Sequence, residues 1–289
     1  MFEGFTRARI PTRLGELNVV HGGEGPPLVL FHGYLQTHVA WRMVAPHLAR
    51  CYHVIAADLP GHGDSDKPPP GPNHVNYAKR TMGEAVIDMM AELGYDRFRL
   101  AGHDRGGRVS YRLALDHPEK VHKLCLLDMT PNLETFERVE QDFHTAFRMW
   151  HWFFLAQPAP LPESMLERCP EEYVRHKLDL NLRVKEAISP EAMDEYVRCF
   201  SNPATIHATC NDYRATATID CEIDDVSRKR GDRIRLPTMV IMGNGRSDAF
   251  DLWRKWIEDP RCIDAHCGHY VPEEAADLVT RSLLDFLAD

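Results

Sequence analysis

The chain has 289 residues, of which 44% are hydrophobic and 27% are charged. This length and composition predict either one large α/β domain with an insertion or two small domains, with a sizeable buried core. The formal net charge is -9, and no basic stretch is present. These features argue against a nucleic-acid-binding protein.

The N-terminal segment and the cysteines indicate the expected compartment. Residues 1–11 contain no apolar signal-peptide core, and the sequence has no run of about 18 consecutive apolar residues. We therefore expect a cytoplasmic protein that neither enters nor binds a membrane. Eight cysteines are scattered without a CxxC pair, which favours free buried thiols over disulfides or a zinc site. We predict neither a metal nor an organic cofactor.

Short apolar runs alternate with helical patterns along the chain. The runs predict strands that are buried on both faces, at Pro27–Phe31, His53–Ala57, Phe98–Ala101, Leu124–Leu127 and Thr238–Met242. The helical patterns occur at about Ala40–Ala49, Lys79–Leu93, Arg105–Asp116, Leu252–Glu258 and Glu274–Ala288. This alternation predicts an α/β fold with a mostly parallel central sheet and helices on both of its faces.

The alternation stops after Asp128 and resumes near Arg235. Helical patterns and aromatic residues dominate the stretch between them. An insertion at the carboxyl end of a strand in a parallel sheet is placed over the ligand crevice. We therefore predict a core domain made of residues 1–132 and 233–289, with residues 133–232 forming a helical cap.

The strongest motif is Gly102-x-Asp104-x-Gly106, which ends an apolar strand pattern and opens a helical one. The G-x-S-x-G nucleophile elbow has this context, because small residues must flank a nucleophile that is held on a strained turn. Here the central residue is an aspartate. The alternative interpretation is a loop carboxylate that only caps the following helix.

Two further motifs accompany the elbow in the expected order. His32-Gly33-Tyr34 closes an earlier strand, and Gly268-His269 precedes the last helical pattern. Together the three motifs resemble the α/β-hydrolase superfamily over nearly the whole chain, which implies the α/β-hydrolase fold with His269 as the catalytic base. By the same resemblance, the backbone N–H groups of Tyr34 and Arg105 form the oxyanion hole.

An aspartate nucleophile predicts a different reaction from a serine. A carboxylate is already ionised at neutral pH, so it can attack a saturated carbon directly and expel a halide or open an epoxide. The product of this step is an alkyl ester of Asp104. His269 then activates a water molecule that attacks the ester carbonyl, and the resulting oxyanion needs backbone N–H donors.

Two arginines follow the nucleophile. Arg105 and Arg108 lie in the first turn of the predicted helix, where the positive end of the helix dipole adds to their charge. Guanidinium groups bind carboxylates in a bidentate manner, so the pair predicts a substrate with a carboxylate beside its electrophilic carbon. The alternative is that one or both arginines pair with acidic residues such as Asp128, or face solvent.

The sequence Gly102-His-Asp-Arg-Gly-Gly-Arg108 closely resembles the fluoroacetate and haloacetate dehalogenases. In that family the two arginines bind the substrate carboxylate. The stretches that begin at His151-Trp152 and at Cys210 are similar to the family's halide-binding segments, so the resemblance implies that His151, Trp152 and Tyr213 hold the halide. It also implies a homodimer. Without the resemblance, the aromatic stretch after His151 indicates ordinary cap packing.

Several residues could orient His269. Asp248 and Asp251 follow the strand pattern Thr238–Met242, which is a common position for the acid in the superfamily. Asp128 follows the earlier strand and matches the position in the haloacetate dehalogenases. Asp248 lies farther from its strand than the usual spacing, so Asp128 is the favoured prediction.

These features predict hydrolytic dehalogenation of a short 2-haloacid, such as fluoroacetate or chloroacetate, to glycolate and halide. An epoxide hydrolase is the main alternative, with Tyr213 and Tyr196 donating to the epoxide oxygen. The arginine pair disfavours it, because an uncharged epoxide needs no guanidinium group. A non-catalytic binding module is a third possibility, but the nucleophile, the base and the acid candidates are all present in the sequence.

Overall fold

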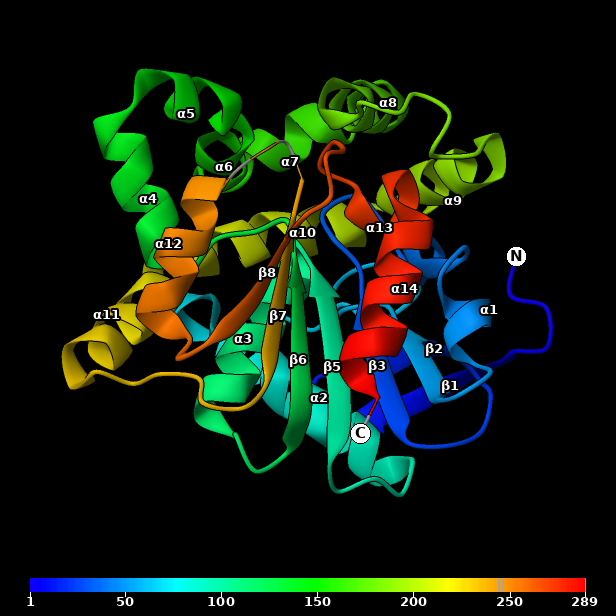
Figure 1. Cartoon of the computed structure of the whole chain (residues 1–289). Helices are drawn as coiled ribbons and strands as arrows, with labels where there is room; N and C mark the ends of the chain where they lie inside the picture. The colour runs from blue at the N-terminus through cyan, green and yellow to red at the C-terminus, as the bar shows by residue number, and fades with distance from the viewer. Residues whose placement is uncertain (244, 246, 289) are drawn as a thin grey trace.

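The computed structural model describes residues 1–243, 245 and 247–288. Its centre is an eight-stranded sheet with the order β1-β2-β4-β3-β5-β6-β7-β8 (Figure 1). The strands are β1 (Thr6–Thr12), β2 (Gly15–Gly22), β3 (Pro27–Phe31), β4 (His53–Ala57), β5 (Phe98–His103), β6 (Val121–Leu127), β7 (Thr238–Met242) and β8 (Pro260–Asp264). Strand β2 pairs antiparallel with both β1 and β4. The six strands β3 to β8 pair with one another in parallel.

The five strands predicted from apolar runs correspond to β3 to β7, and the predicted α/β architecture with a mostly parallel sheet is confirmed. The sequence did not reveal β1, β2 and β8. Strands β1 and β8 are the two edges of the sheet, where one side of the strand faces solvent and polar residues are tolerated. Arg7 and Arg9 in β1 and Arg261 in β8 therefore interrupt the apolar pattern.

Helices cover both faces of the sheet, with the bounds α1 (Ala45–Leu48), α2 (Lys79–Glu92), α3 (Arg105–Asp116), α12 (Ser247–Trp256), α13 (Val271–Glu274) and α14 (Ala276–Leu287), and with two short 3-10 helices at His38–Trp41 and Pro72–Tyr77. The helix predicted at 40–49 is in fact a 3-10 turn followed by α1. Pro46 lies in the first turn of α1, where the proline ring tolerates a helix start but not a helix interior.

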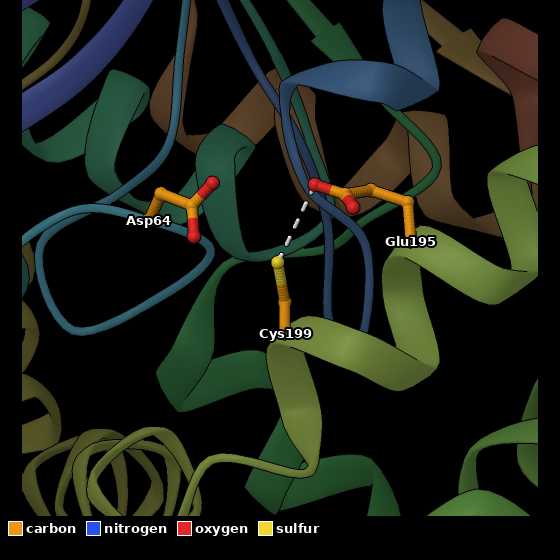
Figure 2. Close-up of side chains that lie close together, drawn as sticks. All are labelled: Asp64, Glu195 and Cys199. Atoms are coloured by element: carbon orange, nitrogen blue, oxygen red, sulfur yellow. Dashed lines mark hydrogen bonds between the residues drawn. The ribbon is translucent and has the colours of Figure 1, made fainter.

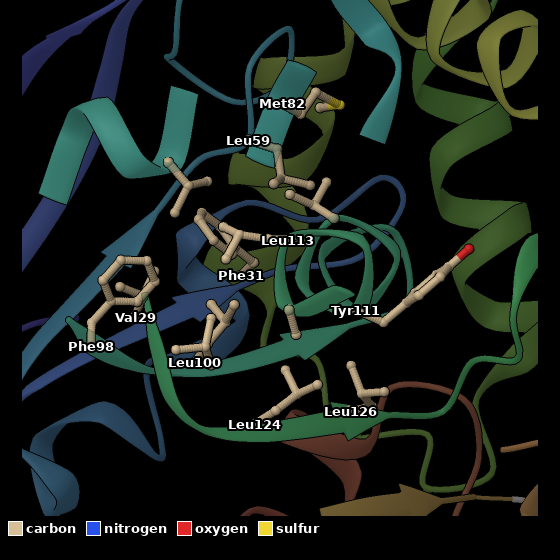
Figure 3. Close-up of a cluster of buried hydrophobic side chains, with 14 of the residues drawn as sticks. Val29, Phe31, Leu59, Met82, Phe98, Leu100, Tyr111, Leu113, Leu124 and Leu126 are labelled. Carbon is tan, nitrogen blue, oxygen red and sulfur yellow. The ribbon is translucent and has the colours of Figure 1, made fainter. Parts of the chain in front are cut away.

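Alternate residues of the strands face two separate apolar layers. Val29 and Phe31 pack with α2, α3 and α12 (part of this layer is shown in Figure 3), whereas Leu28 and Leu30 pack with α1 and α14. Because both faces are covered, the central strands read as continuous apolar runs. This packing fixes the carboxyl ends of β5 and β6, from which the residues of the candidate site emerge.

The stretch between β6 and β7 is helical, with α4 (Asn132–Gln141), α5 (Phe143–Arg148), α6 (Trp150–Leu155), α7 (Leu161–Leu166), α8 (Pro170–Asn181), α9 (Pro190–Phe200), α10 (Pro203–Ala215), a π-helical turn (Thr216–Asp220) and α11 (Cys221–Arg230). Figure 1 shows α4 to α9 beyond the carboxyl ends of the parallel strands. Their aromatic residues share a core with Tyr34, Leu35 and Val39. Among the described residues, no helix is both long and apolar enough to cross a membrane.

Candidate active site

Asp104 lies at the sharp turn between β5 and α3, with φ 43° and ψ -110°. A non-glycine residue with positive φ is strained, and such strain persists only where the surroundings hold it. The motif glycines allow the required close packing. A Cβ atom on Gly102 would lie 2.5 Å from the backbone oxygen of Gly106, and one on Gly106 would lie 2.5 Å from Cβ of Phe31.

The Asp104 carboxylate is buried and surrounded by positive groups. Its Oδ2 accepts a 2.9 Å hydrogen bond from the backbone N–H of Tyr34 and lies 3.9 Å from Nε2 of His269. Its Oδ1 lies 4.0 Å from Nε of Arg108. Burial raises the pKa of Asp104, but His269 and Arg108 outweigh this effect and hold the pKa well below its ordinary value. Asp104 is therefore ionised at neutral pH.

His269 lies between two carboxylates. Its Nδ1 donates a 2.6 Å hydrogen bond to Oδ2 of Asp128, while Oδ1 of Asp128 accepts a 2.9 Å bond from the backbone N–H of Gly243. Burial lowers the pKa of His269, but Asp104 and Asp128 outweigh burial and raise it to about 9. The imidazole is therefore protonated while Asp104 carries its charge.

The other candidate acids lie elsewhere. Asp248 is on α12, is exposed and pairs with Arg138. Asp251 is also exposed and pairs with Arg254. Of the three aspartates considered from the sequence, Asp128 is the one that contacts His269.

Arg105 is paired with a buried acidic residue that the sequence interpretation did not consider. Its Nε donates to Oδ2 of Asp212 at 2.8 Å, and Nη2 donates to Oγ1 of Thr216 at 2.6 Å. The guanidinium carbon lies 4.3 Å from the ring centroid of Tyr213. The alternative that one arginine pairs with an acidic residue thus holds for Arg105, with Asp212 in place of Asp128. Its Nη1 is buried and has no hydrogen-bond partner among the described residues.

The charge of Arg108 is less fully compensated by acidic residues than that of Arg105. Its Nη1 donates to the backbone oxygen of Thr130 and to Oδ1 of Asn132, which are both neutral acceptors. The guanidinium carbon lies 4.5 Å from the ring centroid of Trp152. Nε is buried without a hydrogen-bond partner in the described part of the chain. Arg108 therefore presents an N–H group and a positive charge beside Asp104.

The three predicted halide ligands cluster next to the arginines. His151 and Trp152 come from α6, and Tyr213 from α10; the ring centroid of Tyr213 lies 5.9 Å from that of His151 and 5.8 Å from that of Trp152. Burial, followed by the positive charge of Lys177, holds the pKa of His151 well below its ordinary value, so the imidazole is neutral. Its Nδ1 is buried and has no partner among the residues that the structure describes.

A cavity of about 470 Å³ opens over Asp104 and is lined by Arg108, His151, Trp152 and His269. Lys177 also lines it, and Arg138, Arg148 and Arg183 contribute further positive charge. Arg105 and Tyr213 are not among the lining residues. The cavity is thus rich in cations although the whole chain is acidic, an arrangement that attracts anionic ligands.

Sequence reasoning missed two residues of this region. Asp212 adjoins Tyr213 within a stretch that resembled the halide-binding segments, so its position was a usable signal. It pairs with Arg105 and with Lys79. Lys177 gave no signal, because one lysine on an amphipathic helix is normally solvent-exposed. It is 3% exposed.

One cluster elsewhere has the side chains of a metal site. Asp64, in the loop after β4, approaches Glu195 and Cys199 of α9, with the carboxylates half-buried and the thiol buried (Figure 2). The guanidinium group of Arg198 donates to both Asp64 and Glu195. Burial raises the pKa of the Cys199 thiol well above its ordinary value. A bound cation would have to displace Arg198 and deprotonate this thiol, so the cluster is better described as a salt bridge network.

The fold and the site geometry agree with the comparison to known proteins. Residues 26–276 match the alpha/beta hydrolase fold family. The chain therefore belongs to the alpha/beta hydrolases.

Two relatives and one solved structure refine this assignment. The chain is 38% identical to a fluoroacetate dehalogenase from Burkholderia sp, over 100% of this chain and 96% of the relative. It is 34% identical to a soluble epoxide hydrolase from Corynebacterium sp. (strain C12), over 94% and 93%. A putative alpha/beta hydrolase from Nostoc sp PCC 7120 superposes with a TM-score of 0.96 at 43% identity, covering 100% of this chain and 99% of that chain. The resemblance to the haloacetate dehalogenases is thus confirmed at the level of the family.

Proposed function

We propose that the protein is a hydrolytic dehalogenase that converts a short 2-haloacid, such as fluoroacetate or chloroacetate, to glycolate and halide. The observation that carries the proposal is the position of Arg108, which, among the described residues, has no close carboxylate other than that of the nucleophile Asp104. A substrate carboxylate bound there would hold its α-carbon beside Asp104. The similarity to a fluoroacetate dehalogenase supports the same substrate class.

In the first step, an oxygen of Asp104 attacks the halogen-bearing carbon. The carbon–halogen bond breaks, its electron pair leaves with the halide, and an ester forms between Asp104 and the acid. We assign Arg108, and the unpaired Nη1 of Arg105, to the substrate carboxylate. His151, Trp152 and Tyr213 would donate N–H and O–H groups to the departing halide.

Ester formation prepares the second step. It removes the charge of Asp104, which is one of the two causes that raise the pKa of His269. His269 then releases its proton to solvent more readily and, oriented by Asp128, takes a proton from the attacking water. The hydroxide attacks the carboxyl carbon of Asp104, and the Tyr34 N–H stabilises the oxyanion. The ester bond breaks, His269 gives its proton to the departing oxygen of glycolate, and Asp104, which retains one oxygen from water, ionises and returns a proton to His269.

An epoxide hydrolase remains the second candidate, because a soluble epoxide hydrolase is also similar over most of the chain. Ring opening would need a donor to the epoxide oxygen. The hydroxyl of Tyr196, one of the two tyrosines considered from the sequence, donates to Oε1 of Glu273 at 3.2 Å. The charge of Arg108 also favours an acid over an uncharged epoxide.

The cap, the oligomeric state, the location and the cofactor requirement also belong to the proposal. We infer that residues 133–232 act as a cap over the cavity, since His151, Trp152 and Lys177 come from this stretch. A homodimer and a cytoplasmic location stay predictions, as does activity without a metal or organic cofactor.

The proposal is tested by incubating the purified protein with fluoroacetate, chloroacetate and a small epoxide. Halide release is followed with an ion-selective electrode, and diol formation by chromatography. We expect halide release from at least one haloacetate. Diol formation without any halide release would replace the proposal by the epoxide hydrolase.

A further inference from the structure

Lys177 is a buried cation that the scheme above does not use. It lies on α8, is 3% exposed, and lines the cavity together with Asp104 and His151. In the described part of the chain its ammonium group forms neither an ion pair nor a hydrogen bond. Burial lowers the pKa of Lys177 to about 8, and the charge of Asp104 partly counteracts this effect. The ammonium group is therefore largely charged at neutral pH.

Several other buried cations in the described part of the chain are compensated by acidic residues. Asp212 pairs with both Arg105 and Lys79, Glu163 pairs with Arg214, and Glu273 pairs with Arg42. Burying a charge without a partner is strongly unfavourable. In the described part of the chain Lys177 has no such partner, and Arg108 has only Asp104, at 4.0 Å; both cations line the cavity. Arg108 has the proposed task of binding the substrate carboxylate, so a second anion is needed to explain Lys177.

The proposed reaction supplies that second anion. Before displacement, the site holds the charges of Asp104 and of the substrate carboxylate. After displacement, Asp104 is an uncharged ester and the negative charge is on the halide. His151, Trp152 and Tyr213 are neutral donors, so they offer no compensating charge. Lys177 and His151 line the same cavity over Asp104, and, after burial, the charge of Lys177 is the next largest cause that lowers the pKa of His151. The ammonium group therefore faces the cavity that the predicted halide ligand His151 also faces.

We propose that Lys177 supplies the positive charge that stabilises the departing halide, next to the neutral donors of His151, Trp152 and Tyr213. This inference rests on the proposed function. No proton is transferred in this step: the electron pair of the carbon–halogen bond leaves with the halide, and the anion remains beside the ammonium group. The contribution is greatest for fluoride, because fluoride is the smallest and poorest leaving group and needs the most charge stabilisation.

The test is a leaving-group series on Lys177→Met, a substitution of similar length without charge. The rate of ester formation is measured in single turnovers with fluoroacetate, chloroacetate and bromoacetate. Removing one stabilising group of a developing anion commonly slows a reaction by about 100-fold. We expect a loss of this order with fluoroacetate and a much smaller loss with bromoacetate, with Lys177→Arg recovering part of the fluoroacetate rate. An equal loss with all three substrates, or no loss, would overturn the inference.

Two controls separate this role from a structural one. Lys185→Met removes a cation of the same insertion that is exposed and pairs with Asp179, and its ratio of fluoroacetate to bromoacetate rates should stay that of the wild type. Thermal unfolding verifies that Lys177→Met is folded, with Lys177→Gln as a second variant. 2-Chlorosuccinate carries a second carboxylate, distal to the halogen-bearing carbon. If Lys177→Met only raised the KM for this substrate, Lys177 would bind the distal carboxylate, and the halide role would be overturned.

Bromide binding tests the inference independently of catalysis. Bromide is titrated into the free wild-type protein and into Lys177→Met, and binding is followed by tryptophan fluorescence, because Trp152 lies in the cavity lining. We expect at least tenfold weaker binding in the variant. If the wild type cleaves no haloacid, the proposed function fails, yet weaker bromide binding in Lys177→Met would still support the anion site. Equal binding in both proteins would refute it.

Discussion

Nδ1 of His269 lies 2.6 Å from Oδ2 of Asp128, although the two residues are 141 positions apart in the chain. Asp128 follows β6, and His269 precedes α13. The contact fixes the imidazole so that Nε2 lies 3.9 Å from Asp104. Asp104, His269 and Asp128 thus place the charged, proposed nucleophile next to a proposed base, which becomes available once the nucleophile has been esterified.

The nucleophile and the base should fail at different steps. Asp104→Asn removes the attacking carboxylate and should abolish ester formation. His269→Gln leaves Asp104 able to attack, but water activation is lost, which slows ester hydrolysis by about 100-fold or more. Mass spectrometry after incubation with chloroacetate should detect the carboxymethyl adduct only in His269→Gln. Absence of the adduct in both variants would refute the two-step scheme.

The acid should matter mainly for the second step. In Asp128→Asn, the amide N–H₂ or carbonyl would face Nδ1 without the carboxylate charge, which lowers the pKa of His269 and disfavours the correct tautomer. We expect ester hydrolysis to slow by about 100-fold or more, with a smaller effect on ester formation. Quench-flow measurement of both steps checks this. Asp248→Asn is the matched control, because Asp248 is exposed and pairs with Arg138; a larger effect there would contradict the assignment.

The pH dependence of ester hydrolysis follows from the charge of Asp104. The pKa of His269 in the free protein is about 9, and the charge of Asp104 is one of the causes that raise it. Esterification removes this cause, so the pKa that governs hydrolysis should be below 9. The hydrolysis rate should rise with pH and level off above that pKa. A rate that keeps rising well beyond pH 9 would indicate that hydroxide, and not His269, is the base.

The same group links stability to pH in the free protein. The folded pKa of His269, about 9, exceeds its ordinary value of 6.5, so protonation favours the folded state. This stabilisation is fully present below about pH 6.5 and is lost as the pH rises through 9. Urea unfolding of the wild type and His269→Gln should therefore show a difference in the free energy of unfolding that shrinks between these pH values. A difference that grows over the same range would contradict the protonated state.

Asp212 is expected to be important for stability. It is buried and pairs with both Arg105 and Lys79, so Asp212→Asn removes the carboxylate that pairs with Arg105 and leaves Lys79 with Asp220 alone. Breaking a buried ion pair in this way destabilises a protein by about 3–5 kcal/mol. Asp179→Asn, in the exposed pair with Lys185, should change the free energy of unfolding by less than about 1 kcal/mol. Equal effects in urea unfolding would show that the Asp212 pairs contribute no more than surface pairs.

The sequence by itself determined the parallel core of the fold and named the groups that are proposed to react. Strands buried on both faces appear as apolar runs, and the elbow around Asp104 needs small residues at fixed spacing, so both are encoded locally. The edge strands β1 and β8 were missed because a half-exposed edge tolerates charged residues.

Only the tertiary structure decided which charges meet. Asp128 follows β6 and His269 follows β8, and the two come together because both strands pair with β7. No local pattern in the sequence decides between Asp128 and Asp248. Arg105 and Arg108 both lie in the first turn of the same helix, yet Asp212 on α10 pairs with Arg105, and no contact between Asp212 and Arg108 is found among the described residues. Lys177 looks like a surface residue in its helix and becomes a buried cation only when α8 packs over the cavity. Burial and charge pairing depend on distant segments, so they are properties of the folded chain.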